Sequence, residues 1–263
     1  MFYNDEIRKV FSEVSEVAGY LWEKGWAERN GGNISYNITG VVDDGISGLS
    51  ALGEECPLPE AVPELSGEYF LVTGTGCRMR KVSSDLMNNA AIIRIMPGGG
   101  SYEIIAEKYV KPTSELPSHL LIHAYLKRVG RKEKAVIHTH PTELVAMTHN
   151  DTFLQKDVLS KLLWSMIPET RAFCPKGVGV VRYELPGSLD LAHRTIDQLA
   201  EYDAVLWEKH GALAIGENLT EAFDFIDTLS KSAQIYVSAR SMGYVPAGLS
   251  ERQMAELKEV FNL

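Results

Sequence analysis

The sequence has little cysteine, no long apolar run and no stripe of basic residues. Its three cysteines, Cys56, Cys77 and Cys174, are scattered and form no CxxC pair, which argues against a disulfide framework and a thiolate zinc site. No apolar stretch reaches the roughly 18 residues of a membrane span, and the first residues form no signal-peptide core. We therefore expect a cytoplasmic protein without a membrane partner. The net charge of −9 and the missing Lys/Arg stripe argue against nucleic acid as a partner.

Nucleotide-binding fingerprints are also missing, because no glycine-containing loop matches GxGxxG or GxxxxGK[ST] with a following helix. Three other loops carry phosphate-binding residue types: Asn-Gly-Gly-Asn at 30–33, Thr-Gly-Thr-Gly at 73–76 and Thr-Ser at 113–114. Adjacent glycines let backbone amides approach an anion, and amide and hydroxyl side chains add donors. An ordinary turn or a helix N-cap would explain each loop alone. Together the three loops predict a phosphate pocket.

The remaining pattern predicts a mixed fold. A length of 263 residues and a hydrophobic fraction of 45% allow a sizeable core. Apolar spacing predicts helices over 3–24, 114–127, 141–148, 153–164, 188–201, 218–241 and from 250 onward. It predicts strands over 34–38, 69–72, 91–96, 102–106, 135–140 and 177–181, and a strand pair over 204–215 that turns at 210–211. Residues 40–67 form an irregular excursion. We expect one α/β domain over 1–263, with three layers and a central, mainly antiparallel or mixed sheet between helices.

The most informative motif is His138-Thr139-His140, which follows the apolar run 135–137. Residues i and i+2 of a strand face the same side, so both imidazoles enter one space and make half of a site for a divalent metal. Two rings that only stack or hydrogen-bond would give the same spacing. Glu115 and His210 also lie beside turn-forming residues, and a helix N-terminus alone would favour a carboxylate at Glu115. With the histidines, however, a catalytic metal site is the leading interpretation.

The other histidines receive a simpler interpretation. His119 and His123 share a helix face, but the stretch lacks the glutamate of an HExxH zinc motif. We interpret them as packing or interface residues. His149 and His193 are expected at the surface.

Several motifs, taken together, resemble the class II aldolases of the adducin-like fold. They are residues 24–33, the loop at 73–76, Pro-Thr-Ser-Glu-Leu-Pro at 112–117 and the histidine pair at 138–140. The stretches 175–179 and 226–234 narrow the resemblance to the branch of the family that acts on L-rhamnulose 1-phosphate. The similarity runs from about residue 14 to the C-terminal helices, and the motifs occur in the order of the family.

The resemblance implies a zinc enzyme that reversibly splits L-rhamnulose 1-phosphate, a small sugar phosphate of L-rhamnose catabolism, into dihydroxyacetone phosphate and L-lactaldehyde. It implies one zinc per subunit, held by His138, His140 and His210, and places the acid/base role on Glu115. The phosphate would lie against Asn30, Gly31, Asn33, Thr75, Thr113 and Ser114. Glu169 falls near a family glutamate that serves proton transfer from a neighbouring subunit. The family assembles as a fourfold homotetramer with sites at its interfaces.

Two features depart from the family pattern, and other functions remain open. Thr75 replaces a common serine, and residues 40–67 resemble the family only loosely. A sugar-phosphate 4-epimerase or a methylthioribulose-1-phosphate dehydratase of the same fold would share the histidines. A non-catalytic module like the head domain of adducin would not need them. No lysine occurs in a comparable motif, which disfavours a Schiff-base aldolase.

Overall fold

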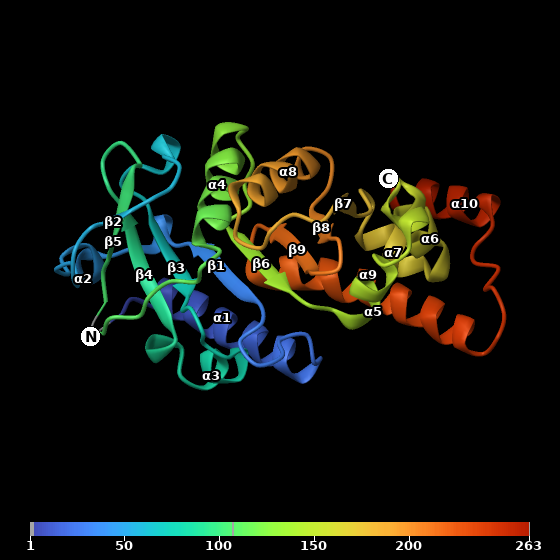
Figure 1. The fold of residues 1–263 in the computed structure, drawn as a ribbon, viewed down its shortest axis with the longest axis horizontal. Coiled ribbons are helices and arrows are strands. Elements are labelled where there is room, and N and C mark those ends of the chain that lie inside the picture. Colours follow the sequence, from blue (N-terminus) through green and yellow to red (C-terminus); the bar gives the residue numbers. More distant parts are fainter. Residues whose placement is uncertain (1–2, 107, 263) are drawn as a thin grey trace.

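The computed structural model describes residues 3–106 and 108–262 of the chain (Figure 1). These residues contain a nine-stranded open sheet in the order β2-β5-β4-β3-β1-β6-β9-β8-β7. Strands β7 and β8 pair in parallel, and the other neighbouring strands pair antiparallel. The strands are β1 (Asn33–Asn37), β2 (Cys56–Pro57), β3 (Tyr69–Thr73), β4 (Ala90–Ile95), β5 (Ser101–Ile104), β6 (Ala135–Thr139), β7 (Gly179–Val181), β8 (Ala204–Trp207) and β9 (Gly211–Gly216).

Helices cover both faces of this sheet. The α-helices are α1 (Asp5–Glu23), α2 (Asp44–Ser47), α3 (Met79–Ser84), α4 (Leu116–Arg128), α5 (Thr142–Met147), α6 (Val158–Met166), α7 (Pro168–Phe173), α8 (Leu189–Leu199), α9 (Leu219–Ser241) and α10 (Glu251–Phe261). Short 3₁₀ turns occur at Thr39–Val41, Pro63–Leu65, Leu86–Asn88 and Asp151–Leu154. In Figure 1, α4 and α8 lie above the sheet, whereas α1 and α3 lie below it.

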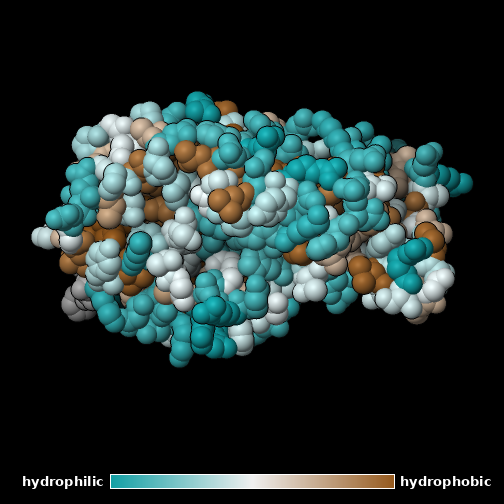
Figure 2. Space-filling model, viewed as in Figure 1, coloured by the Kyte–Doolittle hydropathy of each residue, from teal (hydrophilic) through white to brown (hydrophobic). Residues whose placement is uncertain are grey.

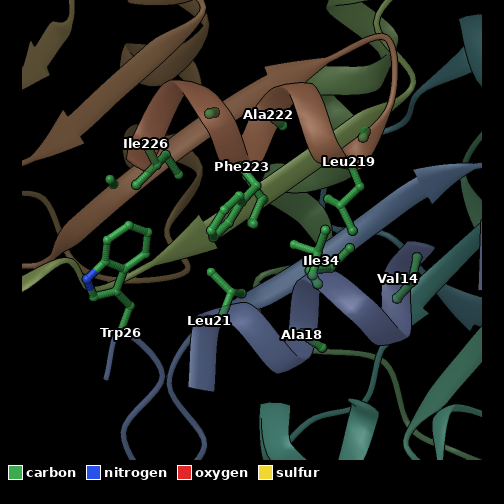
Figure 3. Close-up of a cluster of buried hydrophobic side chains, with 14 of the residues drawn as sticks. Val14, Ala18, Leu21, Trp26, Ile34, Leu219, Ala222, Phe223 and Ile226 are labelled. Carbon is green, nitrogen blue, oxygen red and sulfur yellow. The ribbon is translucent and has the colours of Figure 1, made fainter. Parts of the chain in front are cut away.

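Alternate residues of each strand separate two layers of core. Ile34 of β1 and Ile137 of β6 pack in the cluster that contains the apolar faces of α1 and α9. Figure 3 shows Leu21 of α1 and Phe223 of α9 meeting beside Ile34. Val136, one residue along β6, instead belongs to a cluster with residues of α4 and α8. The expected α/β fold, with a mainly antiparallel sheet between helices, is therefore confirmed.

Most element boundaries agree with the sequence pattern, and the differences have local causes. The expected helix over 153–164 is divided, because Asp157 has a positive φ of 64° between a 3₁₀ turn and α6. At the start of α9, Asn218 is the N-cap, and its side chain accepts from Glu221 N at 2.8 Å. The Glu221 carboxylate accepts from Glu217 N, at 2.6 Å. Residues 40–67 are mostly irregular and add only short helices and the edge strand β2.

The surface in Figure 2 is mostly hydrophilic, with apolar side chains in small separate groups. Within the described residues, no helix has both the length and the apolar character needed to cross a membrane. That the chain forms one domain over 1–263 stays a prediction.

Candidate metal and phosphate site

One small cavity gathers almost every residue that the sequence singled out. It has a volume of about 190 Å³ and lies at the edge of the sheet where β1 begins and β3 and β6 end. Its lining consists of Asn30, Gly31, Gly32, Asn33, Gly74, Thr75, Gly76, Thr113, Ser114, Glu115, His138, His140 and His210. Of the predicted site residues, only Glu169 is absent from this lining.

Strand register brings these distant segments together. Asn33 at the start of β1 pairs with His138 near the end of β6, and β6 pairs on its other side with β9. His210 lies in the turn between β8 and β9, as the sequence predicts. On the far side of β1, Thr113 N donates to Thr73 O at 2.9 Å, which fixes the segment before α4 beside the end of β3. The ends of the paired strands at this edge of the sheet therefore hold the site residues in place.

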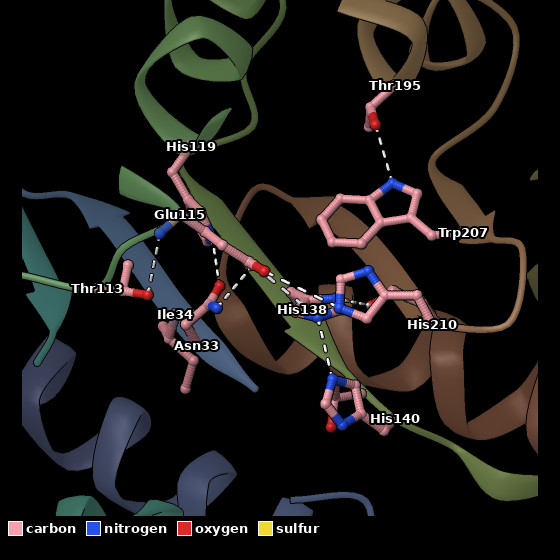
Figure 4. A network of polar contacts seen from close by, with 12 residues as sticks. Asn33, Ile34, Thr113, Glu115, His119, His138, His140, Thr195, Trp207 and His210 are labelled. Atoms are coloured by element: carbon pink, nitrogen blue, oxygen red, sulfur yellow. Dashed lines mark hydrogen bonds and ion pairs between the residues drawn. The ribbon is translucent and has the colours of Figure 1, made fainter. Parts of the chain in front are cut away.

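The three histidines have the donor chemistry of a metal site (Figure 4). Their ligand nitrogens lie within 4.8 Å of one another. His138 Nδ1 contacts Ala212 O at 3.0 Å, and His140 Nδ1 contacts Glu28 Oε1 at 2.8 Å. Because both oxygens can only accept, both Nδ1 atoms carry the hydrogen, and each neutral ring presents a lone pair at Nε2. Oxygen partners of this kind orient metal-binding histidines in many proteins.

The two lone pairs face each other, and this contact tests whether a metal fits. His138 Nε2 and His140 Nε2 are 3.2 Å apart, a distance at which two acceptors repel unless a cation lies between them. Two ligands at about 2.0–2.1 Å from a tetrahedral zinc ion would be roughly 3.4 Å apart. His210 Nδ1 is buried and has no hydrogen-bond partner in the described structure. The donor set therefore suits a divalent cation.

Burial favours the neutral form of His138 and His210. Burial, together with the nearby His140 and His210, holds the pKa of His138 well below its usual value. Burial also lowers the pKa of His210, although the Glu115 carboxylate opposes this shift. The Trp207 ring lies 4.4 Å from the His138 ring, centroid to centroid, and covers it from solvent. Neutral imidazoles are the form that binds metals.

Two glycines beside the histidines leave no room for a side chain of their own. A Cβ at Gly211 would lie 2.7 Å from His138 Cε1 and 2.9 Å from His140 Cδ2. A Cβ at Gly31 would lie 2.9 Å from His140 Nδ1. Beside His210, Lys209 has a positive φ of 59°, and its N–H donates to Thr148 Oγ1 at 2.8 Å. A left-handed residue of this type stores strain of about 1–3 kcal/mol, which the surrounding contacts must offset.

Glu115 lies opposite the histidines and is held in place. Asn33 Nδ2 donates to Glu115 Oε2 at 2.8 Å. The same oxygen is 3.9 Å from His138 Nε2, and Oε1 is 4.0 Å from His210 Nε2. Glu115 occupies the N-cap position of α4, just before the first turn in which the sequence placed it, and its carboxylate turns toward the histidines instead of capping the helix. This geometry suits a ligand or an acid/base group.

The remaining lining offers uncharged hydrogen-bond donors. No lysine or arginine lines the cavity among the described residues. Amide and hydroxyl side chains come from Asn30, Thr75, Thr113 and Ser114. Gly31 also lines the cavity, and its backbone N–H donates to Glu28 O at 2.7 Å. The N-terminus of α4 opens beside Ser114, and a helix N-terminus attracts anions. These groups can bind a phosphate without a basic side chain.

Four polar partners of the site were not expected from the sequence. They are Glu28, which holds His140, and the buried Ser35, His119 and His123 behind Asn33. His119 and His123 are packing residues, as expected, but they are also hydrogen-bonded. Two patterns in the sequence indicate such contacts. Polar residues alternate at 33, 35 and 37, and the histidines at 119 and 123 share one helix face. Neither pattern shows that the strand residues would contact these histidines.

Glu169 lies on α7, outside the cavity lining. Its expected role, in which one subunit supplies it to the site of a neighbour, stays a prediction. His149 and His193 are exposed, as expected, and His193 pairs with Glu60 at 2.9 Å.

The fold and the site define a class of protein: an open mixed sheet that carries a histidine cluster able to bind a metal beside a phosphate-type pocket. The profile described as "Class II Aldolase and Adducin N-terminal domain" matches residues 12–237. The chain belongs to this family, which confirms the resemblance drawn from its motifs.

Similar proteins carry a more specific name. A rhamnulose-1-phosphate aldolase of Bacteroides thetaiotaomicron is 52% identical over 257 residues, covering 98% of this chain and 96% of that protein. One of Mannheimia succiniciproducens is 36% identical, with 85% and 83% covered. The crystal structure of a sugar-phosphate aldolase from Thermotoga maritima superposes with a TM-score of 0.79 at 36% identity, covering 92% of this chain and all (100%) of that one.

Proposed function

We propose that this protein is a zinc-dependent lyase that reversibly cleaves L-rhamnulose 1-phosphate to dihydroxyacetone phosphate and L-lactaldehyde. The observation that carries the proposal is the single cavity in which three histidines, a carboxylate and three phosphate-type loops converge. A relative that is 52% identical over 98% of this chain is named for this activity. The predicted aldolase is thus confirmed at the level of the family and of this name.

His138, His140 and His210 would hold one zinc ion per subunit. When bound, the ion would act as a Lewis acid toward the ketose oxygens. Imidazole ligands also suit cobalt and other divalent ions, so the assignment of the metal as zinc is part of the proposal. The oriented rings of His138 and His140, whose Nε2 atoms face each other, support this ligand set.

Glu115 is the proposed acid/base group. In the cleavage direction, Glu115 would take the proton of the C4 hydroxyl as the C3–C4 bond breaks, which releases L-lactaldehyde and leaves an enediolate on the dihydroxyacetone phosphate half. Glu115 returns a proton to the C3 carbon of this enediolate, and it removes the same proton in the aldol direction. Its position within 4.0 Å of His138 and His210 and its bond from Asn33 support this role.

The phosphate group would bind to Asn30, Gly31, Asn33, Thr75, Thr113 and Ser114. Asn33 differs from the others, because its amide nitrogen donates to Glu115 and its amide oxygen contacts His119. One N–H of its amide group remains for a substrate. We further propose a cytoplasmic homotetramer of L-rhamnose catabolism, in which Glu169 of each subunit reaches a neighbouring site.

The test is a coupled assay that follows NADH-dependent reduction of released dihydroxyacetone phosphate after addition of L-rhamnulose 1-phosphate. We expect release that a chelator abolishes and that zinc restores. Ribulose phosphate and methylthioribulose phosphate serve as comparison substrates. Release of no dihydroxyacetone phosphate by fully metallated protein would overturn the aldolase, and turnover of a comparison substrate would assign the epimerase or dehydratase instead.

A further inference from the structure

A buried polar stripe runs behind the cavity, between β1 and α4. On β1 its members are Asn33 and Ser35, which share one face of the strand because side chains repeat every two residues. On α4 they are His119 and His123, four residues apart on one helix face. Two strand residues span about 6.7 Å. Four helix residues span about 6 Å, so the strand and the helix remain in step.

The stripe is buried between the cavity, which Asn33 lines, and a second pocket, which His123 lines. Ser35 and His119 are 0% exposed and His123 is 3% exposed, and the Phe70 ring lies 4.8 Å from the His123 ring. Burial lowers the pKa of His119 to about 4 and that of His123 to about 3. Between these ends the polar atoms of Ser35 and His119 need partners within the protein, because water cannot supply them.

The contacts have only one consistent direction. The Glu115 carboxylate accepts, so the Asn33 group that faces it is the NH₂, and the Asn33 carbonyl oxygen must face His119. His119 therefore carries its hydrogen on Nε2 and donates to Asn33.

The same reasoning continues inward. Because neutral His119 has its hydrogen on Nε2, its Nδ1 accepts from the Ser35 hydroxyl at 2.8 Å. The Ser35 oxygen then accepts from His123 Nε2 at 2.8 Å. Every hydrogen bond points from His123 toward Glu115.

We propose that Asn33, Ser35, His119 and His123 form a polar ladder that positions Glu115 for proton transfer. The ladder holds the Asn33 amide with its NH₂ toward the carboxylate. With the amide reversed, its carbonyl oxygen would face the carboxylate, and Glu115 would lose its partner and turn away from the substrate carbon. His119 and His123 are positioning residues in this proposal, which rests on the acid/base role proposed for Glu115.

The direction of the ladder can be observed without any activity. Neutron diffraction from crystals of the zinc-bound protein, exchanged into D₂O, would locate the deuterium atoms. We expect deuterium on Nε2 of both His119 and His123 and on the side of Ser35 Oγ that faces His119. Deuterium on Nδ1 of His119 would overturn the proposal.

The positioning role is tested by the solvent exchange of the hydroxymethyl proton of dihydroxyacetone phosphate, followed by proton NMR in D₂O. We expect His119→Leu, which removes the donor, to slow exchange about 10–100-fold while zinc content and KM stay near wild type, a loss typical of outer partners in metal sites. His119→Gln keeps an N–H donor at a similar reach, so we expect it to restore most of the rate.

Should His119→Leu fail to fold, Ser35→Ala breaks the ladder without changing the histidines, and we expect slower exchange at unchanged KM. Its matched control is Ser160→Ala, which removes another buried hydroxyl, one that bonds the backbone of Val178 away from the cavity. Equal rates for His119→Leu, His119→Gln and wild type, or equal losses in both His119 variants, would overturn the positioning role alone. No exchange in the metallated wild-type protein would instead overturn the proposed function itself.

Discussion

At the scale of single residues, the chemistry of the site depends on which ring nitrogen carries the hydrogen. His138 and His140 present lone pairs to the cavity because their Nδ1 atoms donate to the Ala212 carbonyl and to Glu28. These two acceptors fix the orientation of the rings and leave each Nε2 facing the cavity as the ligand atom. The histidines of the metal site are therefore oriented by residues that do not themselves line the cavity.

The first prediction at this scale concerns Glu115. In Glu115→Gln the side chain keeps its size, but it can no longer take up and return a proton. Since general acid/base catalysis contributes about 10²–10⁴-fold, we expect kcat for cleavage to fall by about that factor. Zinc content by atomic absorption and the Kd of dihydroxyacetone phosphate should stay near wild type. Turnover close to wild type would remove Glu115 from the acid/base role.

The second prediction concerns His210. We expect His210→Ala to lose most of its bound zinc, because a site with two imidazoles is left where three converge. The measurement is zinc per subunit after dialysis against a weak chelator. His193→Ala is the matched control, since His193 is an exposed histidine far from the cavity lining. Full zinc occupancy in His210→Ala would exclude this residue as a ligand.

At the scale of elements, the antiparallel β8/β9 hairpin positions His210 beside the end of β6. Its turn carries the left-handed Lys209, and its second strand begins at Gly211, directly against the rings of His138 and His140. The close approach requires glycine, since any side chain at 211 would occupy the space of those rings. The geometry of the β8/β9 turn therefore also determines the geometry of the metal site.

A third prediction tests this coupling. Gly211→Ala adds a Cβ 2.5 Å from Thr139 O and 2.7 Å from His138 Cε1, so strand β6 and the ring must shift. Overpacking of this kind costs about 1–3 kcal/mol of unfolding free energy, and we expect a parallel loss of zinc affinity. Thermal unfolding and zinc titration measure the two effects. Gly40→Ala, where a Cβ would meet no atom within 4 Å, should change neither.

At the scale of the whole molecule, the sheet separates two cores and concentrates its polar contacts at one edge and along one stripe. Buried histidines on that stripe make folding sensitive to acid. Burial, together with the nearby His119, lowers the pKa of His123 from its usual 6.5 to about 3 in the folded protein. Below pH 6.5 the unfolded chain therefore binds more protons, and the unfolding free energy falls as pH falls toward the folded-state value.

The fourth prediction concerns this loss of unfolding free energy at low pH. At about 1.4 kcal/mol per pH unit, His123 alone should remove about 2 kcal/mol of unfolding free energy between pH 6.5 and 5. We expect His123→Gln to show a shallower pH dependence than wild type in urea unfolding at fixed protein concentration with a chelator present. His193→Gln, at the surface, should keep the wild-type slope. Identical slopes in His123→Gln and wild type would contradict the buried neutral state.

Much of this protein is determined by the sequence alone. Helix α1 and the strands β4 and β5 are predicted because their apolar periods are local. His138 and His140 are predicted as partners because they are two residues apart on one strand. The gathering of the phosphate-type loops with Glu115 and His210 is anticipated by the motifs of the family, and the cavity contains all of them.

The tertiary structure alone decides the pairings that cross between elements. Glu28 meets His140 across 112 positions, and Ser35 meets His119 across 84 positions, through the register of β1 against β6 and the seating of α4 on β1. A polar residue in a sequence shows that it needs a partner, but not which one. The partner follows from the docking of whole elements, and that docking is set by the apolar cores on both sides of the sheet.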